Sequence, residues 1–525
     1  DAFELLVGEW VDTDLDGVGD NSDHYPTDIN CWSDADGDDV NSDGSVGCDQ
    51  AQVGITEINL GNIKAHNGLT MSGVAANDRL GFQVSGLGDI NKDGFDDYAV
   101  SANWFDIEGV SNVGKIYVIF GSENKFTDNL DFTIDSLDGD NGFEITGSIY
   151  GESLGDYISS LGDINADGID DFMISADDFS YAIFGKSSEW SENLDITTLG
   201  AGQGITITGG NSRMSSALGD INHDGLDDFG LSEGNNVHLF YGRTDAWPET
   251  IDLNDEASLP AYSLYINEVY NVGNAGDING DGIHDLMIVT IVAGTQQGRV
   301  SVVFGAEGIE SQEINILELD GVNGFNIEGE MDNDILGFSV SSADLNNDGL
   351  SDVILGLGSE ENTRIGRAYV IFGSTQTWEA SLDITSLDGT NGLVLMGETG
   401  NDLTGYSVSQ VGDVNGDGLD DIIVGAGFAD LVDKEDAGQA FVVFGTEESW
   451  PSTLNLYELS AEEGFSLEGA LLGDAAGINV AGVGDINGDG FDDIALGAVF
   501  ADPDDKSRAG KAYLIYGFNQ FENQA

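Results

Sequence analysis

A nine-residue pattern of oxygen-bearing side chains occurs seven times in this chain. The pattern is D-[IVL]-N-x-D-G-x-x-D, and its copies begin at Asp89, Asp163, Asp220, Asp277, Asp344, Asp413 and Asp485. Calcium is a hard cation that takes about six to eight oxygen ligands, which a short loop can supply from alternate positions. Glycine at position 6 permits the sharp turn that brings such oxygens together. The pattern therefore predicts seven calcium-binding loops.

The predicted ligands are the side chains at positions 1, 3, 5 and 9 and the backbone carbonyl at position 7. Clusters of Asp, Asn and Gly also occur in ordinary polar turns, but seven copies with the same five positions filled favour a metal site. The ligand residues are Asp89, Asn91, Asp93, Phe95, Asp97; Asp163, Asn165, Asp167, Ile169, Asp171; Asp220, Asn222, Asp224, Leu226, Asp228; Asp277, Asn279, Asp281, Ile283, Asp285; Asp344, Asn346, Asp348, Leu350, Asp352; Asp413, Asn415, Asp417, Leu419, Asp421; and Asp485, Asn487, Asp489, Phe491, Asp493.

The same motif marks a structural repeat, because its copies begin 74, 57, 57, 67, 69 and 72 residues apart. Short alternating segments rich in β-branched and aromatic residues flank each copy, which is typical of strands. In the first unit they are residues 80–88, 96–102, 115–121 and 130–147. Four strands in each of seven units predict an all-β, seven-bladed propeller with four-stranded antiparallel blades.

The two ends of the repeat region predict how the ring closes. The seventh unit has no fourth segment, because the chain ends eight residues after Gly517. A matching segment, residues 57–73, stands before the first motif instead. We therefore expect the N-terminal part of a propeller domain, residues 51–525, to supply the outer strand of the last blade.

The repeated sequence GF-x-V-x(3)-GD-[IVL]-N-x-DG-x-x-D, followed by an aromatic-glycine strand, resembles the FG-GAP repeats of integrin α-subunit propellers and their bacterial relatives. The resemblance covers roughly residues 55–520. It implies calcium ligands at the seven loops. The chain departs from the repeat at the FG position in three units, at residues 154–156, 214–216 and 476–478, and no unit has the proline of the GAP tag.

Residues 1–50 form a different, acidic segment. It resembles about two units of the thrombospondin type 3 calcium repeat, which implies further calcium ions because such a segment has almost no apolar core to hold it. The alternative is an acidic disordered linker, against which stand Trp10, Tyr25 and Trp32. The candidate ligands are Asp12, Asp14, Asp16, Asp20, Asp23, Asp34, Asp36, Asp38, Asp39, Asn41 and Asp43.

The only two cysteines, Cys31 and Cys48, lie in this segment. An even count in an acidic calcium-binding chain favours a disulfide in an oxidising compartment. It would stabilise by about 3 kcal/mol in the chain-entropy model. Two free thiols are the less favoured alternative, since the surroundings are polar. A zinc site lacks ligands, because His24 is the only nearby histidine and there is no CxxC pair.

The charge balance restricts the partners and the location. The chain has 97 acidic and 15 basic residues, for a formal net charge of −82, and seven calcium ions would leave −82 + 14 = −68. Repulsion on this scale destabilises a compact state unless salt screens it. We therefore expect an extracellular protein, secreted or attached to the surface of a bacterium in a saline environment. Nucleic acid is excluded as a partner, and direct membrane insertion is excluded by the lack of an apolar run of about 18 residues.

Function is expected in binding rather than catalysis. The chain has no GxSxG elbow, no HExxH and no phosphate-binding loop, so we assign no catalytic residue. The leading hypothesis is a calcium-stabilised adhesion module that recognises an extracellular protein or glycan. The alternatives are a structural subunit of a surface layer or filament and a calcium-dependent polysaccharide lyase.

The face opposite the calcium loops is the expected place for the ligand. Three loops between the second and third strands are long, at residues 102–113, 427–438 and 498–510. They belong to the first, sixth and seventh blades, which are neighbours in a closed ring. We expect exposed aromatic residues there to contact a sugar or a peptide, with the alternative that each caps its own blade. These residues are Trp104, Phe105, Phe428 and Phe500.

Overall fold

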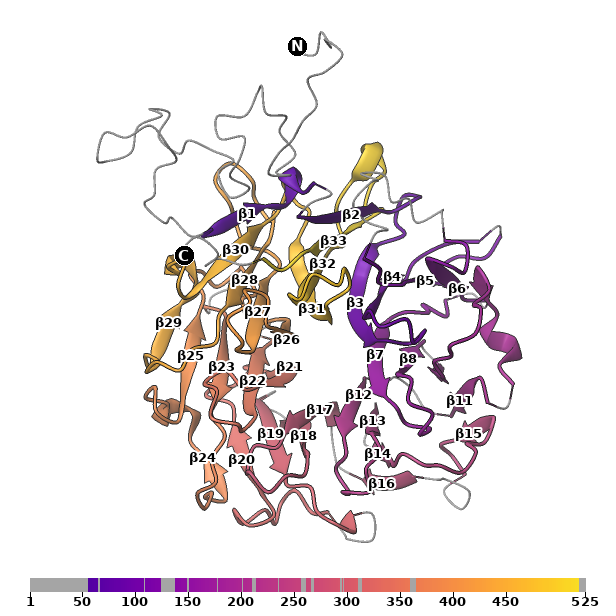
Figure 1. The fold of residues 1–525 in the computed structure, drawn as a ribbon. Helices are drawn as coiled ribbons and strands as arrows, with labels where there is room; N and C mark the ends of the chain where they lie inside the picture. The colour runs from indigo at the N-terminus through magenta and orange to yellow at the C-terminus, as the bar shows by residue number, and fades with distance from the viewer. Residues whose placement is uncertain are drawn as a thin grey trace. The chain divides into compact units, whose positions relative to one another are not determined.

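The computed structural model describes residues 55–518, except 65–66, 108, 124–136, 149–150, 177, 201, 210–213, 235, 256–260, 266–268, 293–294, 296, 310–313 and 359–364. Residues 57–525 form a compact unit of their own. In it, seven sheets follow one another around a ring, and we number these blades 1 to 7 in chain order (Figure 1). The prediction of an all-β, seven-bladed propeller is confirmed, and every helix in the described part is a three-residue 3-10 turn.

Each blade contains four antiparallel strands, which run from the centre of the ring outward. They are β3 (Leu80–Gly88), β4 (Asp97–Ala102), β5 (Lys115–Ile119) and β6 (Gly142–Thr146) in blade 1; β7 (Tyr157–Gly162), β8 (Asp171–Ser175), β9 (Phe179–Ile183) and β11 (Gly204–Thr208) in blade 2; β12 (Ser215–Gly219), β13 (Asp228–Glu233), β14 (Asn236–Phe240) and β16 (Ala261–Tyr265) in blade 3; β17 (Val269–Gly276), β18 (Asp285–Val292), β19 (Gln297–Val303) and β20 (Gly324–Glu328) in blade 4; β21 (Leu336–Ala343), β22 (Asp352–Leu357), β23 (Arg367–Ile371) and β25 (Gly392–Met396) in blade 5; β26 (Val408–Gly412), β27 (Asp421–Ala426), β28 (Gln439–Val443) and β30 (Gly464–Glu468) in blade 6; and β31 (Ala476–Gly484), β32 (Asp493–Ala498), β33 (Lys511–Ile515) and β2 (Gly68–Ser72) in blade 7.

The hydrophobic core is divided among the seven junctions between blades. Each buried cluster draws its side chains from two neighbouring blades. The second strands are therefore covered on both faces, and every residue of β4, β22, β27 and β32 is buried. This explains why these strands are continuous small and apolar runs rather than alternating ones.

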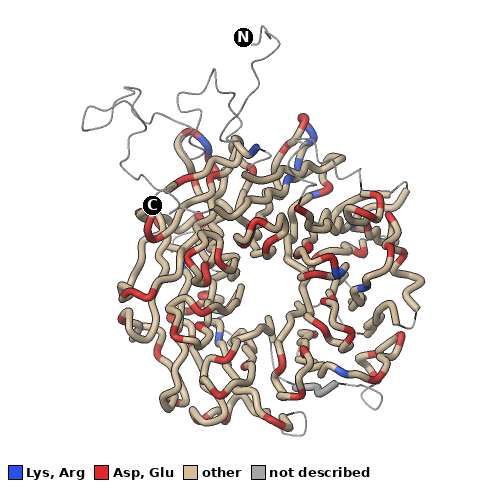
Figure 2. The backbone as a smooth tube through the Cα atoms, in the orientation of Figure 1, with Lys and Arg blue, Asp and Glu red and all other residues tan. Residues whose placement is uncertain are grey.

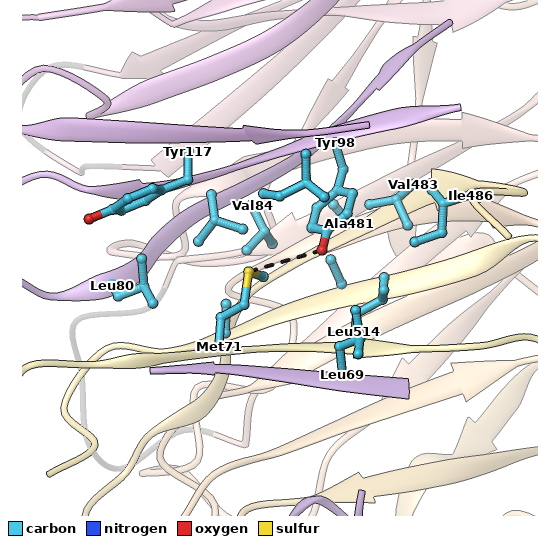
Figure 3. Close-up of a cluster of buried hydrophobic side chains, with 14 of the residues drawn as sticks. Leu69, Met71, Leu80, Val84, Tyr98, Tyr117, Ala481, Val483, Ile486 and Leu514 are labelled. Atoms are coloured by element: carbon cyan, nitrogen blue, oxygen red, sulfur yellow. Dashed lines mark hydrogen bonds between the residues drawn. The ribbon is translucent and has the colours of Figure 1, made fainter. Parts of the chain in front are cut away.

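The predicted closure of the ring by the N-terminal segment is confirmed. Strand β2 pairs antiparallel with β33 and completes blade 7. Its side chains reach the core between blades 7 and 1, where the Met71 sulfur lies 4.0 Å from the Tyr98 hydroxyl (Figure 3). Leu69 and Met71 are almost fully buried there. The closing strand therefore completes the sheet of blade 7 and also packs against blade 1.

A short fifth strand, which the sequence did not predict, extends five of the blades. It is parallel to the fourth strand and comes from the connection between the third and fourth strands of the next blade around the ring. Strand β1 (Glu57–Asn59) does this for blade 6, pairing with β30. Segment 57–73 therefore fastens two blades rather than one. The other four are β10 (Asn193–Leu194), β15 (Thr250–Asp252), β24 (Ser381–Leu382) and β29 (Thr453–Asn455).

Candidate functional site

All seven motifs form loops between the first and second strands of their blades, on one face of the ring, which we call the motif face. In the first loop Asp89 accepts backbone hydrogen bonds from Asp93 at 3.0 Å and Gly94 at 2.9 Å. Gly94 has a φ of 95°, a conformation that glycine adopts without strain. The same pair of bonds to the first aspartate recurs in the other six loops.

The aspartate at position 9 ties each loop to the strands behind it. Asp97 is fully buried, and its carboxylate accepts hydrogen bonds from the N–H groups of Ile90, at position 2, and Gly121, just after the third strand. The corresponding two bonds occur in all seven blades. Position 9 is therefore a structural residue as well as a predicted calcium ligand.

Burial makes a charge at position 9 costly without a cation. Desolvation, followed by the neighbouring loop carboxylates, raises the pKa of Asp97 and Asp493 to about 9. The same cause raises the pKa to about 8 at the other five position-9 residues, which are Asp171, Asp228, Asp285, Asp352 and Asp421. A bound divalent cation would remove this penalty, because it favours the ionised form.

The donor set of each loop fits calcium in kind. Every predicted ligand atom is an oxygen, as a hard cation requires. In the first loop the side-chain oxygen of Asn91 is buried and has no hydrogen-bond partner, while its amide donates to Asp93 at 3.0 Å. Among the described residues, however, no three acidic, histidine or cysteine side chains converge to form a metal site by themselves. The amide and the backbone carbonyl would have to complete the coordination.

Position 8 of the motif, which is not among the predicted calcium ligands, links neighbouring blades. The Asp170 carboxylate of blade 2 accepts a hydrogen bond from the Asp89 N–H of blade 1 at 2.9 Å. Equivalent bonds join blades 2 and 3, 5 and 6, 6 and 7, and 7 and 1. At the two junctions of blade 4, position 8 is His284 or Ser351, and no such carboxylate is available.

These links explain the glycine that precedes most of the motifs. A Cβ atom on Gly88 would lie 2.3 Å from the Asp170 carboxylate, and Gly88 has a φ of 75°. A larger residue would therefore clash with this carboxylate.

A second set of hydrogen bonds joins neighbouring blades on the same face. The Ser122 N–H of blade 1 donates to the carbonyl of Ile486, at position 2 of the motif in blade 7, at 2.7 Å. Counterparts of this bond occur at the other six junctions. The motif face is thus a continuous belt of hydrogen bonds.

The opposite face carries the loops between second and third strands, and we call it the rim face. Its three long loops, in blades 1, 6 and 7, share one conformation. In each, an aspartate side chain accepts a hydrogen bond from the backbone N–H six residues later, at 2.7, 2.8 and 2.6 Å. The residues that donate have φ values of 53°, 52° and 51°. The three loops therefore place Trp104, Phe428 and Phe500 at equivalent positions, two residues before that aspartate.

These three side chains form what we call the aromatic row. The rings of Phe428 and Phe500 lie 6.2 Å apart. The guanidinium of Arg79 lies 3.3 Å from the centre of the Trp104 ring and 5.8 Å from that of Phe500. Arg79 belongs to the connection between blades 7 and 1, so closure of the ring brings the row together. Trp104 is 36% exposed, whereas Phe428 and Phe500 are half-buried.

Phe105 lies differently from the other predicted rim aromatics. Its ring is half-buried against the core between blades 7 and 1, and the ammonium of Lys115 lies 5.0 Å from its centre. It thus caps its own blade, the alternative considered for all four residues. Arg79, by contrast, was not assigned to the rim from the sequence, although it is an arginine in the connection next to the long loops of blades 1 and 7.

Six of the twelve lysines and arginines in the described part of the chain lie in or beside the three long loops, while acidic residues occur throughout the ring (Figure 2). The basic residues in or beside the three long loops are Arg79, Lys115, Lys434, Lys506, Arg508 and Lys511. The three long loops themselves carry more acidic than basic residues, so these basic side chains lie within an acidic surface. The candidate calcium ligands of residues 12–43 and the Cys31–Cys48 pair lie outside the described residues.

The comparisons with known proteins agree with this architecture. The family model of the FG-GAP repeat matches residues 404–443 and 476–515, in blades 6 and 7. The chain contains FG-GAP repeats. Integrin alpha-5 of Xenopus laevis is 29% identical over 188 residues, covering 34% of this chain and 16% of the relative. Integrin alpha-PS2 of Drosophila melanogaster is 30% identical over 193 residues, covering 35% and 12%.

A phosphatidylinositol-glycan-specific phospholipase D of Bos taurus is also similar, with 28% identity over 240 residues, or 42% of this chain and 27% of the relative. The FG-GAP chain thus spans less than a third of each of these relatives. The similarity to integrin alpha subunits agrees with the seven-bladed propeller of this chain. None of the helices in the described part of the chain has the length and hydrophobicity needed to span a bilayer.

Proposed function

We propose that this FG-GAP propeller is a calcium-stabilised binding module that works outside the cell and recognises a protein or glycan through its rim face. The observation that carries the proposal is the contrast between the two faces. The motif face is used for hydrogen bonds that hold the ring together, whereas three like-built loops present Trp104, Phe428 and Phe500 on the other. Similarity to integrin alpha subunits supports a binding role.

Calcium is proposed as the ion of the seven loops. Support comes from the all-oxygen donor set, the orphaned oxygen of Asn91, and a buried carboxylate at position 9 in every blade. Extracellular calcium modules often bind at about 0.1–1 mM, so the ions would stay bound outside a cell and leave inside one. The same reasoning extends to residues 1–50, for which we propose a thrombospondin type 3-like calcium segment closed by a Cys31–Cys48 disulfide.

A saline, bacterial surface is the setting we propose. The formal charge of −82 is only partly offset by the proposed ions, and at about 1 M salt the screening length falls to about 3 Å. Dense acidic surfaces are therefore best tolerated in salty surroundings. A protein of this kind is expected to be secreted or held on the cell surface.

The experiment that tests the proposal is an array of glycans and extracellular proteins, probed with the full chain in calcium and in chelator. A ligand that binds in calcium and is lost with Trp104→Ala or Phe500→Ala supports the rim face. Binding that survives both substitutions contradicts it. Ordered polymers without ligand binding would favour a subunit of a surface layer or filament. Unsaturated sugar products released from a uronate-rich glycan would favour a polysaccharide lyase.

A further inference from the structure

Two arginines of the rim lack the acidic partners that a chain with 97 acidic residues offers in abundance. Within the described residues, neither Arg79 nor Arg508 forms an ion pair with a carboxylate. Basic residues near the start of three third strands, one of them in the rim, do pair: Lys115 with Glu144 at 2.6 Å, Arg299 with Glu328 at 2.6 Å and Arg367 with Glu330 at 3.0 Å. Arg243 of blade 3 also has no carboxylate partner among the described residues and lies 5.4 Å from the centre of the Trp247 ring. Arg79 and Arg508 differ from it in that two unpaired guanidinium groups lie over one ring, that of Phe500.

Four carboxylates of the rim loops and of the connection that carries Arg79 already have partners: the Asp504 carboxylate lies 3.6 Å from the Lys506 ammonium, and the other three accept backbone hydrogen bonds. Asp106 accepts from Asn112 N–H, and Asp502 accepts from the backbone N–H of Arg508 itself. Asp78 is 3% exposed and accepts from the N–H of Ala75 at 2.8 Å. These acids shape the loops instead of forming ion pairs with the guanidinium groups, so the positive charge of the two arginines remains available.

The Arg79 guanidinium is held in place before any ligand arrives. It stacks on Trp104 at 3.3 Å, and both it and the Arg508 guanidinium, at 5.4 Å, lie over the ring of Phe500. Arg79 has a φ of 58°, a costly conformation for a non-glycine residue. Its N–H donates to the carbonyl of Arg508 at 3.2 Å, which fixes this backbone. Strain of this kind is retained where the position of a side chain matters.

Two neighbouring positive charges without a carboxylate partner favour an anion at this place. The Nε atom of Arg79 is buried and has no hydrogen-bond partner. Desolvation, and next the charge of Arg508, lowers the pKa of Arg79, so an anion between the two groups would relieve both effects. A guanidinium that stacks on aromatic rings keeps its edge free for paired hydrogen bonds to a carboxylate.

We propose that Arg79 and Arg508 bind the carboxylate of an acidic sugar within a glycan, and that the aromatic row supports the adjoining sugar rings. This rests on the proposed function, namely that the rim face holds the ligand. A glycan is favoured over an acidic peptide because the row repeats one side-chain position on three consecutive blades. A repeated row of aromatic faces matches a polymer of repeated rings, which pack against such faces through their C–H groups.

The probes are short oligosaccharides of galacturonate, mannuronate, guluronate and glucuronate, each with its carboxyl-reduced neutral counterpart, and a hexaglutamate peptide of similar charge. Binding is measured calorimetrically with the full chain in calcium at about 0.15 M salt, where the screening length of about 8 Å limits repulsion from distant acids. We expect at least one uronate oligosaccharide to bind. Reduction of its carboxyl groups should weaken binding at least about tenfold, since bonds to charged groups are the stronger ones.

The variants are Arg79→Gln, Arg508→Gln and Arg79→Lys, with Arg299→Gln as the matched control, because Arg299 is an arginine of blade 4 that is paired with Glu328. Arg79→Gln should weaken binding of the uronate by at least about tenfold, and Arg79→Lys should restore only part of it, because lysine lacks the planar fork. The control should bind as the unaltered chain does. A thermal scan of each variant shows whether it is folded.

Several results would overturn the inference. They are binding by no uronate, equal binding of acidic and reduced sugars, or binding of hexaglutamate alone, which would indicate a protein partner. Failure of the proposed function has a different signature. In that case an array ligand binds in calcium and is unaffected by Arg79→Gln, Trp104→Ala and Phe500→Ala together. A neutral glycan lost with Trp104→Ala but not with Arg79→Gln would retain the rim face and reject the arginine site.

Discussion

The motif face and the rim face are built from the same seven repeats but use repetition differently. On the motif face the two bonds to position 1 and the two bonds to position 9 recur in every blade. On the rim face, among the residues that the structure describes, one loop design is shared by blades 6, 7 and 1, whereas the connections after β8 and β13 in blades 2 and 3 are only a few residues long. A feature needed to hold a ring must recur at each junction, whereas a feature for one ligand need occur only where the ligand binds.

The largest effect expected from this comparison is that of removing calcium from the motif face. With about 10 mM calcium and a dissociation constant of about 1 mM, each bound loop adds about 1.4 kcal/mol to the free energy of unfolding, or about 10 kcal/mol for seven. Chemical unfolding in calcium and in chelator measures the difference. Equal unfolding midpoints in calcium and in chelator would show that calcium does not stabilise the loops of the motif face.

The next effect is that of opening the ring. Deleting residues 1–73 removes β1 and β2, with the buried side chains of Leu60, Leu69 and Met71. Burial of each such side chain contributes about 1.5–3 kcal/mol, so we expect a loss of about 5–9 kcal/mol. The exposed edge of β33 should also cause association. The control is deletion of residues 1–54, which keeps both strands and should melt and elute as one folded species.

Closure of the ring and the position of the seven motif loops could be predicted, because both follow from the repeats in the sequence. Counting the fourth segments identified 57–73 as the missing copy, and the pairing of β2 with β33 agrees. The fifth strands could not be found, since pairings of two or three residues have no detectable period. Nor could the role of Asp170, because its partner lies 81 residues away in another blade. The order of blades did predict that Trp104 and Phe500 would lie close, but adjacent residues such as Trp104 and Phe105 offered no sign of which faces inward.

The pH dependence of stability should have opposite trends with and without the metal. In the metal-free protein the position-9 carboxyls have folded pKa values of about 8–9 against an ordinary value of 3.8. The folded state then binds more protons than the unfolded state between these limits, so stability falls as the pH rises through this window. Thermal scans of metal-stripped protein at pH 5 and pH 7.5 should show the higher midpoint at pH 5.

With calcium the carboxylates are held in the ionised form, and acidification displaces the ion. The same two scans in calcium should therefore show the higher midpoint at pH 7.5. A metal-free protein that becomes more stable as the pH rises would contradict the origin assigned to these shifts, which is burial of uncompensated carboxyls on the motif face.

A smaller effect distinguishes junctions within the motif face. Asp96→Ala removes the bond that joins blades 1 and 7, where the carboxylate accepts from Asp485 N–H at 3.1 Å. Leaving that N–H without its partner should cost about 1–2 kcal/mol. Ser351→Ala, at the same position beside blade 4, should cost less than about 0.5 kcal/mol, as surface substitutions usually do. Equal losses for the two variants would show that position 8 does not link the blades.

The smallest effect on stability is expected at the rim, and two adjacent residues provide the test. Phe105→Ala removes a ring that packs against the core between blades 7 and 1, and it should lower the free energy of unfolding by about 1–3 kcal/mol. Trp104→Ala removes a ring that is 36% exposed and held mainly by Arg79, so less than about 1 kcal/mol should be lost. Ligand binding should show the reverse order, with Trp104→Ala the more damaging change. If Phe105→Ala weakens ligand binding while Trp104→Ala does not, the aromatic row is not the ligand-binding surface, and binding depends instead on the packing of Phe105 in blade 1.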